Sequence, residues 1–441
     1  MTVTEPSRSA GSLRAGMSDL APAPDMTALT RAFLRIGILS FGGPAAQIAL
    51  MHRELVDRRR WLAEADYLRA LSFCMMLPGP EAMQLATYAG WRLRGVPGGL
   101  VAGGLFVAPG ALVILGLAMA YASFGQVPAI RAGLAGLQAA VVVIVVEALL
   151  RVARRALTGP LHRVVAAAAF LSVFALGVPF WAVILAAAAA GAVAARGATM
   201  PGPAAPAGPV TGTLRAAAIL GAAWLVPLGL LGLLEGGLLW ELGLFFSKLA
   251  VVTFGGAYAV LAAMTQEIVQ DRGWLTLPQM IDALGLAETT PGPLILVTQF
   301  VGYLAAESRG GVWHGLAGAL VALWMTFVPC FLWVFAGAPW IDRLAGMPRL
   351  SGALAAITAA VVGVIANLAV WFAAQVAFDR VGEAALGPLR TIRPDWTSLD
   401  PLSIALTGVA AVLVLGLGRG IATTLAVCGA LSVAAFAAGI G

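Results

Sequence analysis

Long apolar runs recur along the chain and constrain its fold more than any other feature. They include Gly98 to Tyr121, Ala132 to Leu150, Val164 to Ala195, which is long enough for two passes, and Leu402 to Leu417. About 20 apolar residues in a helix span the roughly 30 Å hydrocarbon core of a bilayer. A spanning backbone must satisfy its own hydrogen bonds, and these runs lack the alternation of barrel strands. The sequence therefore predicts an all-α fold, a polytopic membrane helical bundle.

Composition supports this fold class, because 60% of the residues are hydrophobic and only 11% are charged. In soluble domains about a quarter of the residues are charged. The formal charge of +6 would suggest nucleic acid as the partner of a soluble protein. Here the basic residues are dispersed in short loops, where they set membrane topology. We expect the lipid bilayer as a partner, and no nucleic acid.

Two glycine- and proline-rich motifs occur twice at one constant spacing. Phe41 precedes Phe254 by 213 positions (254 − 41), and Pro78 precedes Pro291 by the same number (291 − 78). The first motif reads Ser-Phe-Gly-Gly-Pro and then Thr-Phe-Gly-Gly-Ala, and the second contains Pro-Gly-Pro in both copies. The chain is therefore an internal duplication, and each half contains one Gly-Gly break and one Pro-Gly-Pro break.

The duplication divides the chain into five parts. We predict a disordered tail at 1–27, a first membrane repeat at 28–196, a Pro/Gly/Ala-rich linker at 197–213, a connecting transmembrane helix at 214–235, and a second repeat at 236–441. A single connecting helix inverts the second repeat if each repeat crosses the membrane an even number of times. Arginine is richer at 52–69 and 151–163 than in the matching segments, so these segments are predicted to be cytoplasmic.

The repeated breaks predict a binding site. Short helices interrupted near mid-membrane in two matching repeats point to the transport site of inverted-repeat carriers. A helix that begins at such a break has unpaired N–H groups and a partial positive charge, so it can accept an anion. The alternative is that both motifs only allow close packing and kinks.

The candidate substrate-binding residues are the breaks and the polar side chains beside them. Arg35 and Lys248 are matched cations before the two Gly-Gly breaks, and their alternative role is snorkelling to the interface. The predicted set is Arg35, Ser40, Phe41, Gly42, Gly43, Pro44, Gln47, Pro78, Gly79, Pro80, Gln84, Lys248, Thr253, Phe254, Gly255, Gly256, Thr290, Pro291, Gly292, Pro293 and Gln299.

Two carboxylates are candidate coupling groups. Glu81 follows the first Pro-Gly-Pro break, where it suits an oxyanion only if it is protonated; otherwise it complements the helix dipole. Glu147 lies in an apolar run, and its alternative role is an ion pair with Arg151 four residues later.

The sequence contains no nucleotide-binding or hydrolase motif, which argues against an ATP-driven pump and a familiar hydrolase. A membrane-embedded enzyme such as a reductase would need a redox or nucleophilic cluster. The cysteines and histidines are scattered, and the cysteines are expected to be packing residues: Cys74, Cys330, Cys428, His52, His162 and His314. We expect no enzyme activity, no metal and no cofactor, and the sequence leaves open assembly into a homo-oligomer.

At these motifs the chain resembles the chromate ion transporter family in its long, two-domain form. The resemblance rests on the paired Phe-Gly-Gly and Pro-Gly-Pro motifs, with Trp61 and Trp274 at the same spacing, and covers about residues 28 to 440. Pro44 is matched by Ala257, so the second motif is incomplete. The resemblance implies a carrier that exports chromate across the inner (plasma) membrane by alternating access, with sulfate or another anion as the alternative substrate.

Overall fold

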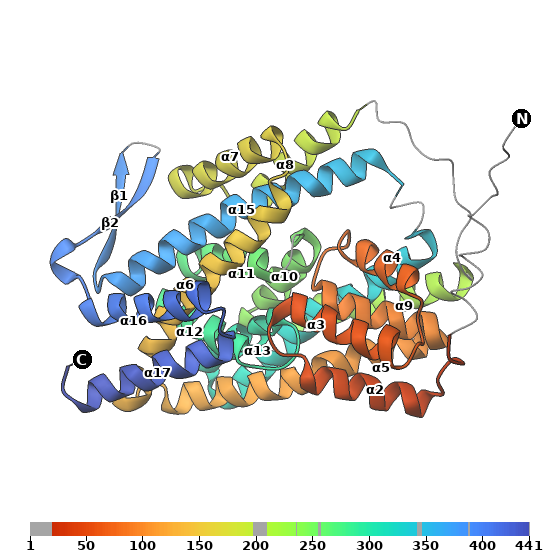
Figure 1. Cartoon of the computed structure of the whole chain (residues 1–441), viewed down its shortest axis with the longest axis horizontal. Helices are drawn as coiled ribbons and strands as arrows, with labels where there is room; N and C mark the ends of the chain where they lie inside the picture. The colour runs from red at the N-terminus through yellow and green to blue at the C-terminus, as the bar shows by residue number, and fades with distance from the viewer. Residues whose placement is uncertain are drawn as a thin grey trace, which may run out of the picture.

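The computed structural model describes residues 20–196, 210–234, 236–254, 257–341, 346–386 and 389–440. Nearly all of these residues are helical (Figure 1). Five helical segments are long and apolar enough to cross a membrane: Glu81–Phe124, Pro128–Ala156, Gly212–Leu234, Leu294–Trp340 and Pro348–Ala377. The predicted polytopic helical bundle is confirmed.

The helices of the two halves follow each other in the same order. The first half contains α2 (Met26–Leu39), α3 (Gly43–His52), the π-helix η1 (Arg53–Arg58), α4 (Glu64–Cys74), α5 (Glu81–Phe124), α6 (Pro128–Ala156), α7 (Pro160–Leu176) and α8 (Phe180–Ala194). The second half contains α10 (Leu238–Val252), α11 (Ala257–Met264), the π-helix η2 (Thr265–Asp271), α12 (Leu277–Glu288), η3 (Leu294–Leu296), α13 (Val297–Gly337), α15 (Pro348–Ala377), α16 (Pro401–Ala411), η6 (Val412–Gly416) and α17 (Ile421–Ala437). The apolar run from Val164 forms two helices, as expected.

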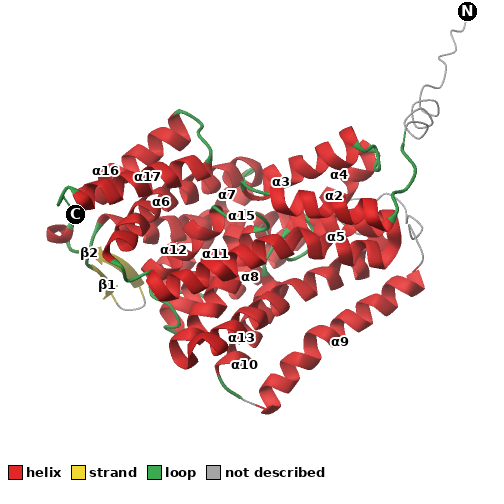
Figure 2. Ribbon diagram, turned by 90° about the horizontal axis from the view of Figure 1, so that it is seen from below, coloured by secondary structure: helices red, strands yellow, loops and turns green. Residues whose placement is uncertain are grey.

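Helix α9 (Val210–Leu234) connects the halves and lies on the outside of the bundle, against α10 and α13 (Figure 2). Only 11% of its most apolar 18-residue stretch is buried, so most of its surface is available to lipid. It begins four residues before the predicted start of the connecting helix. Residues 197–209 of the predicted linker, and 1–19 of the predicted tail, lie outside the described residues.

One element of the second half was not predicted. The polar stretch between α15 and α16 contains two antiparallel strands, β1 (Val381–Leu386) and β2 (Leu389–Pro394), with Val381 paired to Pro394. The hairpin lies at one end of the molecule in Figure 1. The fold is therefore an all-helical bundle with one small hairpin.

Helices α5 and α13 each fold back on themselves near a glycine. Gly95 in α5 and Gly311 in α13 have φ values of 63° and 72°, a region that glycine enters without strain. In α5, Gly90 lies so close to Gly98 that a Cβ on Gly90 would be 2.3 Å from the carbonyl oxygen of Gly98. Gly302 and Gly318 make the equivalent contact in α13. In each half, the short first part of α5 or α13, which follows a Pro-Gly-Pro break, thus packs against the long second part of the same helix.

The two halves interlock. Helices α7 and α8 pack on α15 of the other half, whereas α16 and α17 pack on α6. The long parts of α5 and α13 also touch, because a Cβ on Gly99 would meet Phe335 and one on Gly103 would meet Phe331. Since the residue number rises in one helix as it falls in the other, these two equivalent helices run antiparallel.

Candidate functional site

All four predicted breaks interrupt helices. Gly42, Gly79 and Gly292 have φ values of 87°, 115° and 89°, which a residue with a side chain rarely adopts. The first break lies between α2 and α3, and the two Pro-Gly-Pro breaks lie between α4 and α5 and between α12 and η3. In the break after α10, Gly255 and Gly256 lie outside the described residues.

Each Pro-Gly-Pro break is hydrogen-bonded to the Gly-Gly break of the other half. The N–H of Gly292 donates to the carbonyl of Ser40 at 2.9 Å, and the N–H of Gly79 donates to the carbonyl of Thr253 at 3.0 Å. Both partners are related by the 213-residue offset, so each hydrogen bond is the counterpart of the other. The breaks of the two halves therefore meet in the middle of the bundle.

Side chains reinforce these contacts. Buried Gln47 donates from Nε2 to the carbonyl of Gly292 at 2.6 Å and to that of Ser40 at 3.2 Å. A Cβ on Gly110 would lie 2.2 Å from the carbonyl oxygen of Pro291, and a Cβ on Gly79 would lie 2.8 Å from Cys330 Sγ. The tight contacts leave little room for the breaks to shift.

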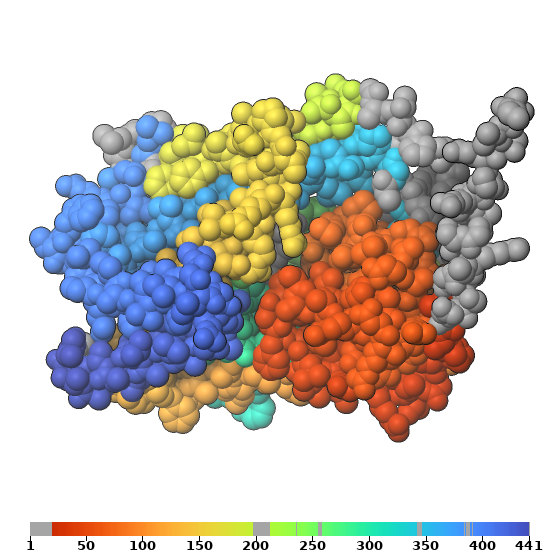
Figure 3. Space-filling view, viewed as in Figure 1, coloured from red at the N-terminus to blue at the C-terminus, as the bar shows by residue number. Residues whose placement is uncertain are grey.

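A cavity of about 320 Å³ adjoins the breaks. Its wall includes Pro44, Glu81 and Tyr258, which lie in the first turns of α3, α5 and α11. Helix α6 contributes Arg151 and Arg155. Its other polar lining residues are Thr158, His162 and Thr358. In Figure 3 the gold surface near the end of α6 lies beside the red and orange surface of the first half. The cavity combines three helix N-termini with two guanidinium groups, an arrangement suited to an anion.

Acidic side chains surround the two arginines. Arg151 donates to Glu147 from both Nε, at 3.2 Å, and Nη2. Tyr258 donates from its hydroxyl to buried Glu288 Oε1 at 2.6 Å. Glu147 is thus paired with Arg151, which was its alternative role.

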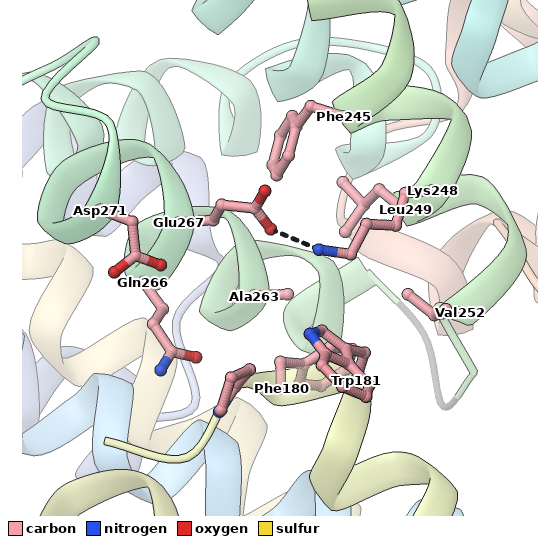
Figure 4. A pocket seen from close by; sticks show the side chains of 11 residues that line it. Phe180, Trp181, Phe245, Lys248, Leu249, Val252, Ala263, Gln266, Glu267 and Asp271 are labelled. Carbon is pink, nitrogen blue, oxygen red and sulfur yellow. Dashed lines mark hydrogen bonds and ion pairs between the residues drawn. The ribbon is translucent and has the colours of Figure 1, made fainter. Parts of the chain in front are cut away.

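The matched cations Arg35 and Lys248 pair with matched carboxylates. Lys248 Nζ lies 3.0 Å from Glu267, in the wall of a separate cavity of about 170 Å³ (Figure 4), and Arg35 Nε lies 3.9 Å from Glu54. The side chain of Lys248 is 44% exposed and that of Arg35 is 51% exposed. Neither residue lines the cavity at the breaks.

These carboxylates also bind a matched arginine. Arg59 bonds Glu54 and Arg272 bonds Glu267, and each guanidinium carbon lies 4.8 Å from the ring centre of Trp61 or Trp274, respectively. Burial raises the pKa of Glu54, but the hydrogen bonds from Arg58 and Arg59 outweigh it and lower the pKa below its usual value. The matched Glu, Arg and Trp side chains thus tie the π-helix of each half to its first helix.

The remaining predicted residues differ in exposure. Phe41 and Gly42 are exposed, whereas Pro291, Gly292 and Pro293 are buried. The hydroxyls of Ser40, Thr253 and Thr290 donate to carbonyls of their own helices. Three of the predicted residues, Gln47, Gln84 and Gln299, have a buried amide oxygen without a hydrogen-bond partner among the described residues. Gly43, Pro44, Pro78 and Phe254 are half-buried, and Gly79 and Pro80 are buried.

Sequence reasoning missed Arg151 and Arg155 as site residues. Both were interpreted as topology signals at the end of a span, and Tyr258 was not considered. Only the folding of α6 against the breaks brings them beside Pro44 and Glu81. Among the described residues, no three histidine, cysteine, aspartate or glutamate side chains form a metal-binding group.

The family model described as "Chromate transporter" matches residues 27–192 and 240–437. The chain belongs to the chromate transporter family. A chromate transport protein of Cupriavidus metallidurans is 30% identical over 83% of this chain and 87% of its own length. One from Pseudomonas aeruginosa is 32% identical over 80% of this chain and 82% of its own length. No solved structure matches. With its apolar helices, the chain is a multi-pass protein of the inner (plasma) membrane.

Proposed function

We propose that this protein is a secondary transporter that exports chromate by alternating access around the four breaks. The observation that carries the proposal is the cavity in which the first turns of α3, α5 and α11 meet Arg151 and Arg155. Backbone N–H groups and guanidinium groups bind tetrahedral oxyanions well, and chromate is a tetrahedral dianion. The names of the relatives support chromate as the substrate.

Export requires no ATP when the cytoplasm is electrically negative. Moving a dianion outward releases roughly 4.6 kcal/mol per 100 mV, since each elementary charge contributes about 2.3 kcal/mol. The absence of nucleotide-binding motifs from the sequence is consistent with this driving force.

Accumulation of chromate in cells tests the function. Chromate-sensitive cells that express the protein should accumulate less chromate and tolerate more of it than cells with an empty vector. Unchanged accumulation and resistance, with the protein present in the membrane, would remove chromate as the substrate. If chromate is transported, adding excess sulfate to everted vesicles shows by competition whether the two anions share the site.

An inverted repeat is part of the proposal. Two features support it: the antiparallel packing of the equivalent parts of α5 and α13, and the reciprocal hydrogen bonds between the breaks. In many alternating-access carriers, two inverted repeats move against each other so that a central site opens toward each side of the membrane in turn.

Cysteine labelling tests the inversion. The natural cysteines Cys74, Cys330 and Cys428 are buried, so they give little background. Gly159→Cys follows α6 and Thr391→Cys lies in β2, which follows the equivalent helix α15. A membrane-impermeant maleimide should label Thr391→Cys in intact cells, but Gly159→Cys only after permeabilisation. Labelling of both from one side would contradict the inverted repeat.

A further inference from the structure

Glu81 is an acidic side chain in the wall of a cavity otherwise suited to an anion. It occupies the first turn of α5, directly after Pro80, and is half-buried. Arg151 and Arg155 line the same cavity. Within the described part of the chain, the side chain of Glu81 makes no hydrogen bond or ion pair, although the positive charge of Arg155 acts on it. Its carboxyl group is therefore free to interact with whatever occupies the cavity.

The charges around the cavity do not favour a bare dianion. Helix α6 contributes the two arginines, α7 contributes His162, α11 contributes Tyr258, and the neutral thiol of Cys74 in α4 lies near Glu81. Behind this wall, Glu147 binds Arg151 and Glu288 binds Tyr258. Glu81, Glu147 and Glu288 thus accompany only two guanidinium groups, so the site has no excess positive charge that would balance an additional dianion.

We infer that the oxyanion binds together with one proton, held between a carboxyl oxygen of Glu81 and an oxygen of the anion. This inference rests on the proposed function. The proton comes from the solvent: it forms an O–H bond to one of the two oxygens and a short O–H···O⁻ hydrogen bond to the other, while the bonds of chromium and carbon stay intact. The transported unit then has one negative charge instead of two, so the membrane potential drives its export with roughly 2.3 kcal/mol per 100 mV, half the value for the bare dianion.

Two consequences distinguish this site from one made only of cations. Anion binding strengthens as the pH falls, because the complex contains one proton more than its separated parts. Anions whose own oxygens accept a proton near neutral pH are also favoured while Glu81 is ionised. Chromate is such an anion, whereas sulfate is a far weaker base. Glu81 is thus a specificity-determining residue as well as a proton carrier.

Titration calorimetry on the purified protein counts the proton directly. Chromate binding is measured at about pH 8 in buffers of different ionisation enthalpy, and the difference gives the protons taken up per chromate. The wild type should take up about one proton, and Glu81→Gln about none. Glu64→Gln is the matched control, since Glu64 also lies in the first turn of a helix but is exposed and outside the cavity. It should behave as the wild type does.

The outcomes separate the two proposals. Chromate binding by the wild type without proton uptake would overturn the proton inference and leave the chromate site intact. Proton uptake that persists in Glu81→Gln would refute the role of Glu81. A wild type that does not bind chromate would overturn the proposed function, and the inference with it. The wild-type stoichiometry is informative even if Glu81→Gln fails to fold.

Discussion

Replacing Arg155 by glutamine is expected to reduce chromate transport about ten- to a hundredfold at low chromate concentration, since a hydrogen bond to a charged group contributes about 1.5–3 kcal/mol. Arg155 lines the cavity at the breaks and makes no ion pair with another described residue, so its charge is available to the anion. Arg151 is less suitable for this test, because it already binds Glu147. Initial rates of chromate uptake into everted vesicles measure the effect.

Arg154→Gln provides the control for this substitution. Arg154 is the preceding residue, is also exposed, and does not line the cavity. Arg154→Gln removes the same charge from the same helix end as Arg155→Gln. Any change in the long-range attraction of chromate or in membrane topology should therefore be shared by both variants. Equal loss of transport in the two variants would show that the net charge of the loop matters, and not the position of Arg155 in the cavity.

Much of the fold could be predicted because its constraints are local. A run such as Ala132 to Leu150 predicts a spanning helix from its length and apolarity alone, and α6 contains it. The constant 213-residue offset predicted that the halves would share one order of helices. The pairing of β1 with β2 could not be foreseen, since the polar residues of this stretch show no clear strand pattern.

The residues that line the candidate site could be predicted only in part, because its contacts join distant segments. The breaks were identified from Pro-Gly-Pro and Gly-Gly, but nothing in the sequence indicates that Gly79 would bond Thr253 or that Gly292 would bond Ser40. Arg35 and Lys248 were predicted to bind substrate because they occupy matching positions in the two halves. In the structure they pair instead with the matched carboxylates Glu54 and Glu267 at the surface. The cavity arginines have no counterpart in the second half, so the repeat could not reveal them.

Gly110→Ala tests whether transport depends on the seating of the breaks. The new Cβ would lie 2.2 Å from the carbonyl oxygen of Pro291, and real Cβ atoms essentially never approach so closely. Backbone must therefore shift, at a cost of about 1–3 kcal/mol. The shift would separate Gly292 from Ser40. We expect a lower melting temperature in detergent and loss of chromate uptake into vesicles.

Gly116→Ala makes the same substitution in the same helix, at a position where a Cβ would meet nothing within 4 Å. It should preserve transport and raise stability by up to about 1 kcal/mol, because alanine favours a helix more than glycine does. Normal transport by Gly110→Ala would show that the breaks tolerate displacement, which would contradict a rigid anion site. If Gly110→Ala loses transport while its melting temperature is unchanged, the contact between Gly110 and Pro291 matters for transport but not for the stability of the fold.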